Sequence, residues 1–142
     1  MPIFKRVKRG GPRDLELSMS GLKIGSSVLQ IDGGDAGLIA ALAGAVGLSG
    51  YACAVAEDDA QAERFTRAAA TAGVLVEVKV SPLGSLPYDP ETFDVVVIKN
   101  LIGEMRARDR VTCLQQAHRA LRVGGRCLVI EQAMRAGLGA LF

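Results

Sequence analysis

The chain lacks several features that would assign it to a common class of protein. Its 142 residues include one histidine and three widely spaced cysteines, Cys53, Cys113 and Cys127, with no CxxC pair. His118 adds too few ligands for a zinc site, so we predict no metal and expect the cysteines to be buried free thiols. No apolar run reaches the ~18 residues of a membrane span, and no h-region follows the N-terminus. We expect no membrane segment, no secretory signal and a cytoplasmic location.

The chain also lacks a large excess of charge of either sign. A net charge of +2 is too small to imply nucleic-acid binding by itself, so we do not expect a nucleic-acid partner. Residues 1–13 nevertheless hold five basic side chains around Gly10, Gly11 and Pro12. This composition predicts a flexible basic arm, either a solubilising tail or a phosphate-binding arm, followed by one domain over residues 14–142.

The abundant residues indicate an α/β domain. The chain is 49% hydrophobic and rich in glycine, and strand patterns alternate with helical ones from Ser26 onward. We predict strands at 27–31, 51–56, 75–80, 93–98 and 126–130, and helices at 14–22, 36–46, 58–72 and 108–121, the last closed by Gly124 and Gly125. Such alternation favours a parallel sheet with right-handed crossovers. Ligands would bind beyond the carboxyl ends of the strands, between strands 27–31 and 93–98.

The segment VLQIDGGDAGLIAALA, residues 28–43, is the strongest single indication of a ligand. An apolar strand pattern passes through a glycine-rich turn into a helical pattern. Glycines let the backbone approach a ligand, and the helix N-terminus offers unpaired N–H groups to anionic atoms. The turn is imperfect, however, because Asp32 and Ala36 stand where such loops usually carry glycine.

Three segments together resemble a known family. They are VLQIDGGDAG (28–37), LPYDPETFDVVVIKNLIGEM (86–105) and CLQQAHRALRVGGRCLVIE (113–131), in that order. Over roughly residues 20–131 they are similar to the class I S-adenosylmethionine-dependent methyltransferases, in particular the ubiquinone/menaquinone-type small-molecule subgroup. The resemblance implies a doubly wound Rossmann-like sheet of order 3-2-1-4-5, S-adenosylmethionine as cofactor and a small-molecule methyl acceptor.

The resemblance also implies roles for residues around the first two strands. Gly33 and Gly34 would wrap the methionine end of the cofactor, whereas Gln30 replaces the acidic residue that helps to hold its ammonium group. Asp32, at the first glycine position, would either repel the cofactor carboxylate or meet that ammonium. Glu57 would accept hydrogen bonds from the ribose hydroxyls, or would serve only to charge the start of the following helix.

Further roles fall after the third and fourth strands. The family's acidic residue near the adenine amino group is replaced here by Pro82, so adenine recognition would pass to backbone atoms or Ser81. Leu83 would cover one face of the ring. Lys99, after the fourth strand, is a further expected cofactor-site residue near the substrate mouth, or else a solvated loop residue.

No residue carries a strong catalytic signature, and two other functions stay open. One is a non-catalytic methyltransferase-like scaffold or interaction domain. The other is a nicotinamide-binding Rossmann oxidoreductase, because Asp32, Gly34 and Gly37 match the G-x-G-x-x-G spacing apart from the first glycine, and Glu57 follows 20 residues later. We read His118, in mid-helix, as a packing or surface residue. The family fold continues beyond the fifth strand with a helix and two strands, so we expect a homodimer or a partner chain to cover that strand.

Overall fold

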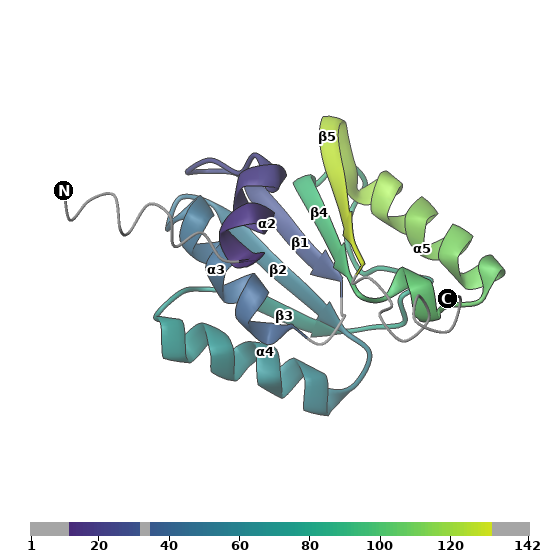
Figure 1. Ribbon diagram of the computed structural model, residues 1–142, viewed down its shortest axis with the longest axis horizontal. Coiled ribbons are helices and arrows are strands. Elements are labelled where there is room, and N and C mark those ends of the chain that lie inside the picture. Colours follow the sequence, from purple (N-terminus) through teal and green to yellow (C-terminus); the bar gives the residue numbers. More distant parts are fainter. Residues whose placement is uncertain (1–11, 32–34, 132–142) are drawn as a thin grey trace, which may run out of the picture.

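The computed structural model describes residues 12–31 and 35–131. Its centre is a five-stranded sheet in the order β3-β2-β1-β4-β5, with all neighbouring strands parallel (Figure 1). The strands are β1 (Ser27–Ile31), β2 (Tyr51–Ala56), β3 (Glu77–Val80), β4 (Phe93–Lys99) and β5 (Leu121–Ile130). This order confirms the predicted doubly wound sheet. The strands are added in one direction from β1 to β3 and in the other from β4 to β5, so the topological switch point lies between β1 and β4.

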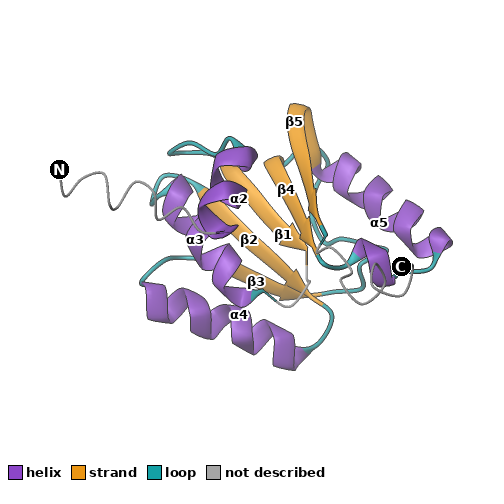
Figure 2. Cartoon of the chain, viewed as in Figure 1, coloured by secondary structure: helices purple, strands orange, loops and turns teal. Residues whose placement is uncertain are grey.

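Helices cover both faces of this sheet (Figure 2). They are α2 (Pro12–Ser20), α3 (Ala36–Val46), α4 (Asp59–Ala72) and α5 (Ala107–Ala120), with a short 3-10 turn, η1, at Ile102–Glu104. Residues of α2, α3 and α4 pack against one face of the sheet, and α5 and the loop after β3 pack against the other. The alternation of β1 explains the two layers, since Val28 faces the first cluster whereas Leu29 and Ile31 face the second.

The ends of the helices follow from local side chains. Asp35 caps α3 by accepting a hydrogen bond from the Leu38 N–H at 3.1 Å, and Asp58 caps α4 in the same way. Gly73 ends α4 in the left-handed conformation that glycine adopts at low cost, as its position predicted. Both caps lie at the carboxyl edge of the sheet, where the chain leaves β1 and β2.

The start of β5 differs from the sequence prediction. We expected α5 to run to Leu121 and the strand to begin at Arg126, but the helix ends at Ala120 and the strand starts at Leu121. The register against β4 shifts between Phe93 and Val95, so residues 122–125 form an irregular insertion that includes Gly124 at φ 82°. Arg122 anchors this insertion by donating to both carboxylate oxygens of Asp94.

Three smaller expectations also need correction. The first helix begins at Pro12, so Arg13 belongs to α2 and not to the predicted arm, the rest of which lies outside the described residues. The third strand begins at Glu77, two residues later than predicted. Cys53 and Cys113 are buried free thiols as expected, but Cys127 is exposed. Within 12–31 and 35–131, the helices are too short or too polar to cross a membrane.

Candidate cofactor site

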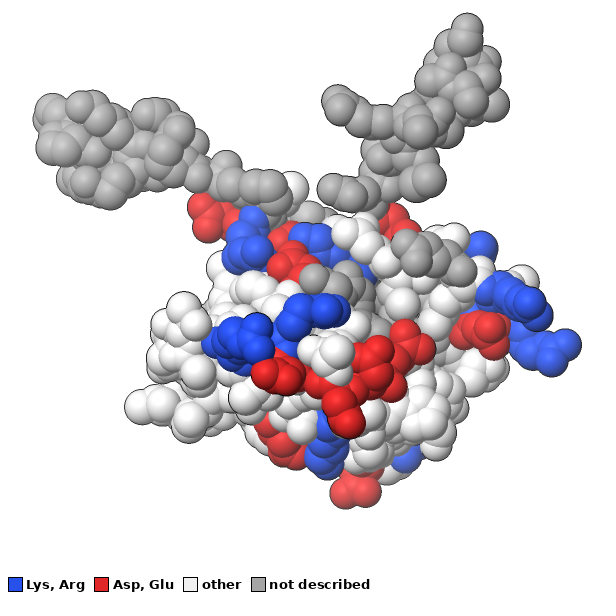
Figure 3. All heavy atoms as spheres, turned by 90° about the horizontal axis from the view of Figure 1, so that it is seen from below, with Lys and Arg blue, Asp and Glu red and all other residues white. Residues whose placement is uncertain are grey.

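The carboxyl ends of the parallel strands place several predicted residues along one edge of the sheet. Gln30 lies in β1, Glu57 directly follows β2, Ser81 and Leu83 follow β3, and Lys99 ends β4. Asp32, Gly33 and Gly34 lie outside the described residues. Seen from below, the molecule carries acidic and basic side chains close together, so this face offers no surface of a single sign to a polyanion (Figure 3).

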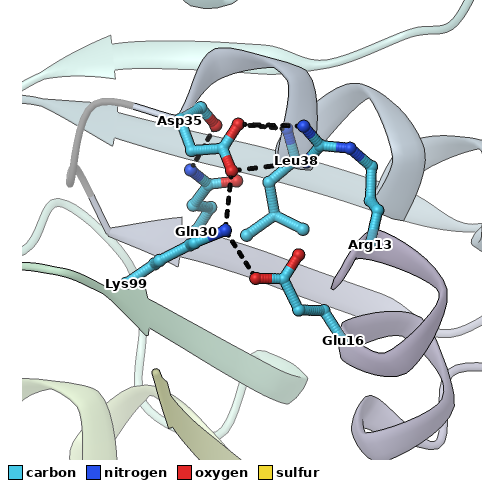
Figure 4. Close-up of polar contacts among 6 residues, drawn as sticks. All are labelled: Arg13, Glu16, Gln30, Asp35, Leu38 and Lys99. Carbon is cyan, nitrogen blue, oxygen red and sulfur yellow. Dashed lines mark hydrogen bonds and ion pairs between the residues drawn. The ribbon is translucent and has the colours of Figure 1, made fainter. Parts of the chain in front are cut away.

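Four charged residues from three elements meet beside the turn after β1 (Figure 4). This ionic cluster consists of Arg13 and Glu16 on α2, Asp35 at the cap of α3, and Lys99. The Lys99 Nζ lies 2.6 Å from Glu16 Oε2 and 2.9 Å from Asp35 Oδ2. The Arg13 guanidinium lies 3.3 Å from each oxygen of the Asp35 carboxylate. The cluster therefore joins the N-terminal helix to the point where the strand order reverses.

Burial and pairing act in opposite directions on the groups of this cluster. Burial raises the pKa of Asp35, but hydrogen bonds from Lys99 and Arg13 outweigh it and hold that pKa below its usual value. Burial likewise lowers the pKa of Lys99, but its bonds to Glu16 and Asp35 raise it above the usual value. Both groups are therefore charged at neutral pH. The side chain of Glu16 is only 8% exposed.

Two buried oxygens beside this cluster have no hydrogen-bond partner among the described residues. They are Glu16 Oε1 and Gln30 Oε1. Gln30 is fully buried, and its amide nitrogen donates to the Asp35 carbonyl at 2.9 Å. Unpartnered buried acceptors are uncommon because each costs free energy comparable to a lost hydrogen bond. Each of these two oxygens therefore has unused hydrogen-bonding capacity.

A pocket of about 470 Å³ opens at the same edge of the sheet. We call it the nucleoside pocket. Its lining comes from the end of β2, the loops after β3 and β4, and α5: Glu57, Leu83, Gly84, Leu101, Met105, Arg106, Asp109, Thr112 and Cys113. Its walls combine apolar side chains with two carboxylates, and its volume suits a ligand of nucleoside size. Glu57 and Leu83 were predicted for such a site, and the structure brings them together.

Three hydrogen bonds hold the loops of this pocket in place. The Leu86 N–H donates to the Gln116 amide oxygen of α5 at 3.0 Å, which fixes the loop after β3. The Glu131 carboxylate accepts from the N–H groups of Leu101 at 3.1 Å and Gly103 at 3.2 Å. The loop after β4 is therefore tied to the end of β5.

Ser81 and Cys113 have restricted chemistry. The Ser81 hydroxyl lies 3.0 Å from the Ser85 carbonyl and 3.3 Å from the Pro82 carbonyl, so its proton is held within its own loop. Burial, with smaller contributions from Cys127 and Glu57, raises the pKa of Cys113 to about 11. A thiol with that pKa is protonated at neutral pH and is not a nucleophile.

A larger hollow, about 670 Å³, lies between α3 and α4. Its floor is mostly alanine, and its titratable groups among the described residues are Arg64 and Arg67. It contains no residue that follows a strand of the sheet. Ligands of open α/β sheets bind outside the carboxyl ends of the strands, so the nucleoside pocket is the stronger candidate despite its smaller volume.

Sequence reasoning missed Arg13, Glu16, Asp35 and Asp109. Asp35 carried a usable signal, because an aspartate directly before a helical pattern is a typical N-cap. Arg13 and Glu16 carried none, since their partners lie in distant elements of the chain.

Together, the doubly wound sheet and the pocket at its strand ends define a domain of the Rossmann-like methyltransferase class. A family model described as "Methyltransferase domain" matches residues 28–125, which is more than half of the chain. The chain belongs to this methyltransferase-domain family.

Individual relatives agree with this assignment of fold. The ubiquinone/menaquinone biosynthesis C-methyltransferase UbiE of Marinomonas sp. (strain MWYL1) is 30% identical over 117 residues, which cover 81% of this chain and 46% of the relative. Aclacinomycin 10-hydroxylase RdmB of Streptomyces purpurascens is 36% identical over 114 residues, or 80% of this chain and 30% of the relative. A SAM-dependent methyltransferase from Aquifex aeolicus superimposes with a TM-score of 0.68 at 23% identity, covering 78% of this chain and 58% of that one. The chain thus spans less than half the length of these two curated relatives.

Proposed function

We propose that this domain binds S-adenosylmethionine and transfers its methyl group to a small-molecule acceptor. The observation that carries the proposal is the position of two complementary subsites at one edge of the sheet. The nucleoside pocket holds Glu57 and Leu83, and the ionic cluster with its two unpartnered acceptors lies beside the turn after β1. A ligand with a nucleoside at one end and an amino acid at the other matches this pair.

The nucleoside end would be held by the pocket walls. Glu57 directly follows β2, where its carboxylate can accept hydrogen bonds from both ribose hydroxyls. Leu83 is 5% exposed and offers an apolar surface to one face of the base. Ser81 would contribute through its backbone, because its hydroxyl proton is already held by carbonyls of its own loop.

The amino-acid end would meet the ionic cluster. The ammonium group can donate to Gln30 Oε1 and Glu16 Oε1. The Gln30 amide of β1 and the Glu16 carboxylate of α2 would together take the role of the acidic residue that β1 lacks. The carboxylate of the cofactor would be attracted by Lys99 and Arg13, the two cations of the ionic cluster, which also pair with Asp35. Asp32, Gly33 and Gly34, in the intervening turn, would complete this subsite.

The cofactor, when bound, supplies an activated sulfonium methyl for in-line displacement. The chain's own contribution is then to bind, orient and exclude water, which alone can account for much of a rate enhancement. We assign no general base among the described residues. Cys113 is excluded as a nucleophile by its protonation at neutral pH.

Titration calorimetry with S-adenosylhomocysteine tests the proposal. We expect micromolar binding, and we expect Glu57→Gln to weaken it about tenfold or more, because a charged acceptor is lost from two hydrogen bonds. Glu63→Gln is the matched control, since Glu63 is an exposed α4 residue whose carboxylate pairs with Arg67 and lies outside the pocket. Absence of binding by the folded wild-type domain would refute the proposal and favour a scaffold function. NAD is titrated in parallel to exclude a nicotinamide site.

Binding without methyl transfer is a separate outcome to be measured. One relative is named as a hydroxylase, so the fold by itself does not establish which reaction follows cofactor binding. An assay of transfer from labelled S-adenosylmethionine to quinone-type and other small phenolic acceptors addresses it. If S-adenosylhomocysteine binds tightly but no methyl is transferred to any acceptor, the transfer part of the proposal is abandoned.

We further propose that a second copy of the chain covers β5, in a cytoplasmic homodimer. β5 is an edge of the described sheet, and Val123 and Val129 in it are 92% and 43% exposed. Unpaired strand edges readily recruit another strand. Light scattering coupled to size exclusion gives the mass directly, and a monomer at every concentration tested would exclude the dimer.

A further inference from the structure

Asp109 contributes the second carboxylate of the nucleoside pocket. It lies in the first turn of α5 and lines the pocket together with Glu57 and Leu83. It is exposed, and no residue of the described part of the chain forms a hydrogen bond or an ion pair with its carboxylate. Its oxygens are therefore available to a ligand in the pocket.

The other polar groups of the pocket do not supply the same chemistry. Arg106 has donors only, and Thr112 has a neutral hydroxyl whose proton is directed at the Arg108 carbonyl at 3.1 Å. Pro82 has neither an N–H group nor a side-chain acceptor. Glu57 and Asp109 are thus the two anionic acceptors that line the pocket.

A bound adenosine needs two kinds of acceptor. Its ribose presents hydroxyl donors, and its base presents an exocyclic amino group as a donor some distance away. Glu57 directly follows β2, whereas Asp109 lies in the first turn of α5. The two carboxylates therefore come from different walls of one pocket, as the two donor groups of a nucleoside require.

We propose that Asp109 accepts a hydrogen bond from the exocyclic amino group of adenine, and so makes the pocket specific for adenine over hypoxanthine. This inference rests on the proposed function. Recognition of the base is thereby transferred from the loop after β3, where Pro82 stands, to the first turn of α5. Asp109 is a specificity residue and takes no part in the methyl-transfer step.

A structural role for Asp109 makes a different prediction. An acidic residue in the first turn stabilises a helix through the helix dipole. Loss of that effect would lower stability without changing which base is preferred. Specificity is therefore the decisive readout.

The experiment compares S-adenosylhomocysteine with S-inosylhomocysteine, in which a carbonyl oxygen replaces the amino group. Calorimetry is performed on the wild type, Asp109→Asn and the control Asp89→Asn, which makes the same change at an exposed residue outside the pocket. We expect the wild type to prefer the adenosyl ligand by ~10- to 100-fold, as a charged hydrogen bond implies. Asp109→Asn should reduce this preference at least tenfold, because an amide can donate to the inosyl carbonyl.

Each outcome is informative. A preference that is unchanged in Asp109→Asn, with both affinities intact or reduced equally, overturns the inference while leaving cofactor binding established. A wild type that binds both ligands equally also overturns it. A wild type that binds neither ligand refutes the proposed function itself. Circular dichroism and the thermal midpoint verify that Asp109→Asn is folded.

Discussion

Replacing Lys99 with methionine removes the central cation of the ionic cluster and keeps a flexible side chain of similar length. The change leaves Asp35 paired with Arg13. It leaves Glu16 with no partner for either carboxylate oxygen among the described residues, because Oε1 already lacks one and Oε2 contacts Lys99. The cost of the substitution is therefore concentrated on Glu16.

The size of that cost follows from the burial of Glu16. Removing one partner of a buried ion pair destabilises proteins by ~3–5 kcal/mol. We therefore expect a loss of about 3 kcal/mol at pH 7, or roughly 10 °C in thermal midpoint.

Chemical denaturation at pH 7 measures this loss of stability directly. The double variant Glu16→Leu/Lys99→Met should recover most of the lost stability, because apolar replacements of a buried pair are often neutral or stabilising. Arg67→Met is the control. It breaks the pair with Glu63, whose side chains are 68% and 70% exposed, and should cost less than ~0.5 kcal/mol.

Two results would show that the reasoning is wrong. A Lys99→Met variant that loses no more stability than Arg67→Met would mean that Glu16 is solvated and that the cluster contributes little. A Glu16→Leu/Lys99→Met double variant that recovers none of the lost stability would mean that the cost arises from packing and not from the unpaired carboxylate.

Two further predictions concern glycine and pH. A Cβ on Gly50 would lie 2.7 Å from the Ser26 carbonyl oxygen, whereas a Cβ on Gly44 in α3 would meet nothing within 4 Å. Denaturant titration should therefore show that Gly50→Ala is destabilised by ~1–3 kcal/mol. The same assay should show that Gly44→Ala is stabilised by up to ~1 kcal/mol. The stabilisation from Asp35, whose pKa is lowered by folding, is present above its unfolded pKa of ~3.9 and is lost as pH falls through the folded value. Thermal midpoints should therefore show a stability difference between wild type and Asp35→Asn that is constant near neutral pH and disappears in acid.

The fold was largely predictable because it depends on patterns that repeat along the chain. The apolar patterns of β1 and β4, the glycine after α4 and the strand-helix alternation are each visible over short stretches of sequence. The irregular insertion within β5 was not predictable in this way. Gly124 and Gly125 are as typical of a helix end as of a strand irregularity, and the choice depends on the contact of Arg122 with Asp94 across the sheet.

The site was predictable only to the extent that the sheet determines it. Parallel strands carry whatever follows them to a common edge, which is why Glu57 and Leu83 were expected together and lie in one pocket. The partners of Gln30 and Lys99 depend instead on how α2 packs against the sheet, and a short helix with few apolar residues carries no signal for that. The contacts of Gln30 in the structure also change its interpretation. Its amide nitrogen donates to the Asp35 carbonyl, and its buried oxygen has no partner among the described residues. A residue that reads in sequence as the loss of an acidic acceptor therefore still presents a neutral acceptor in the structure.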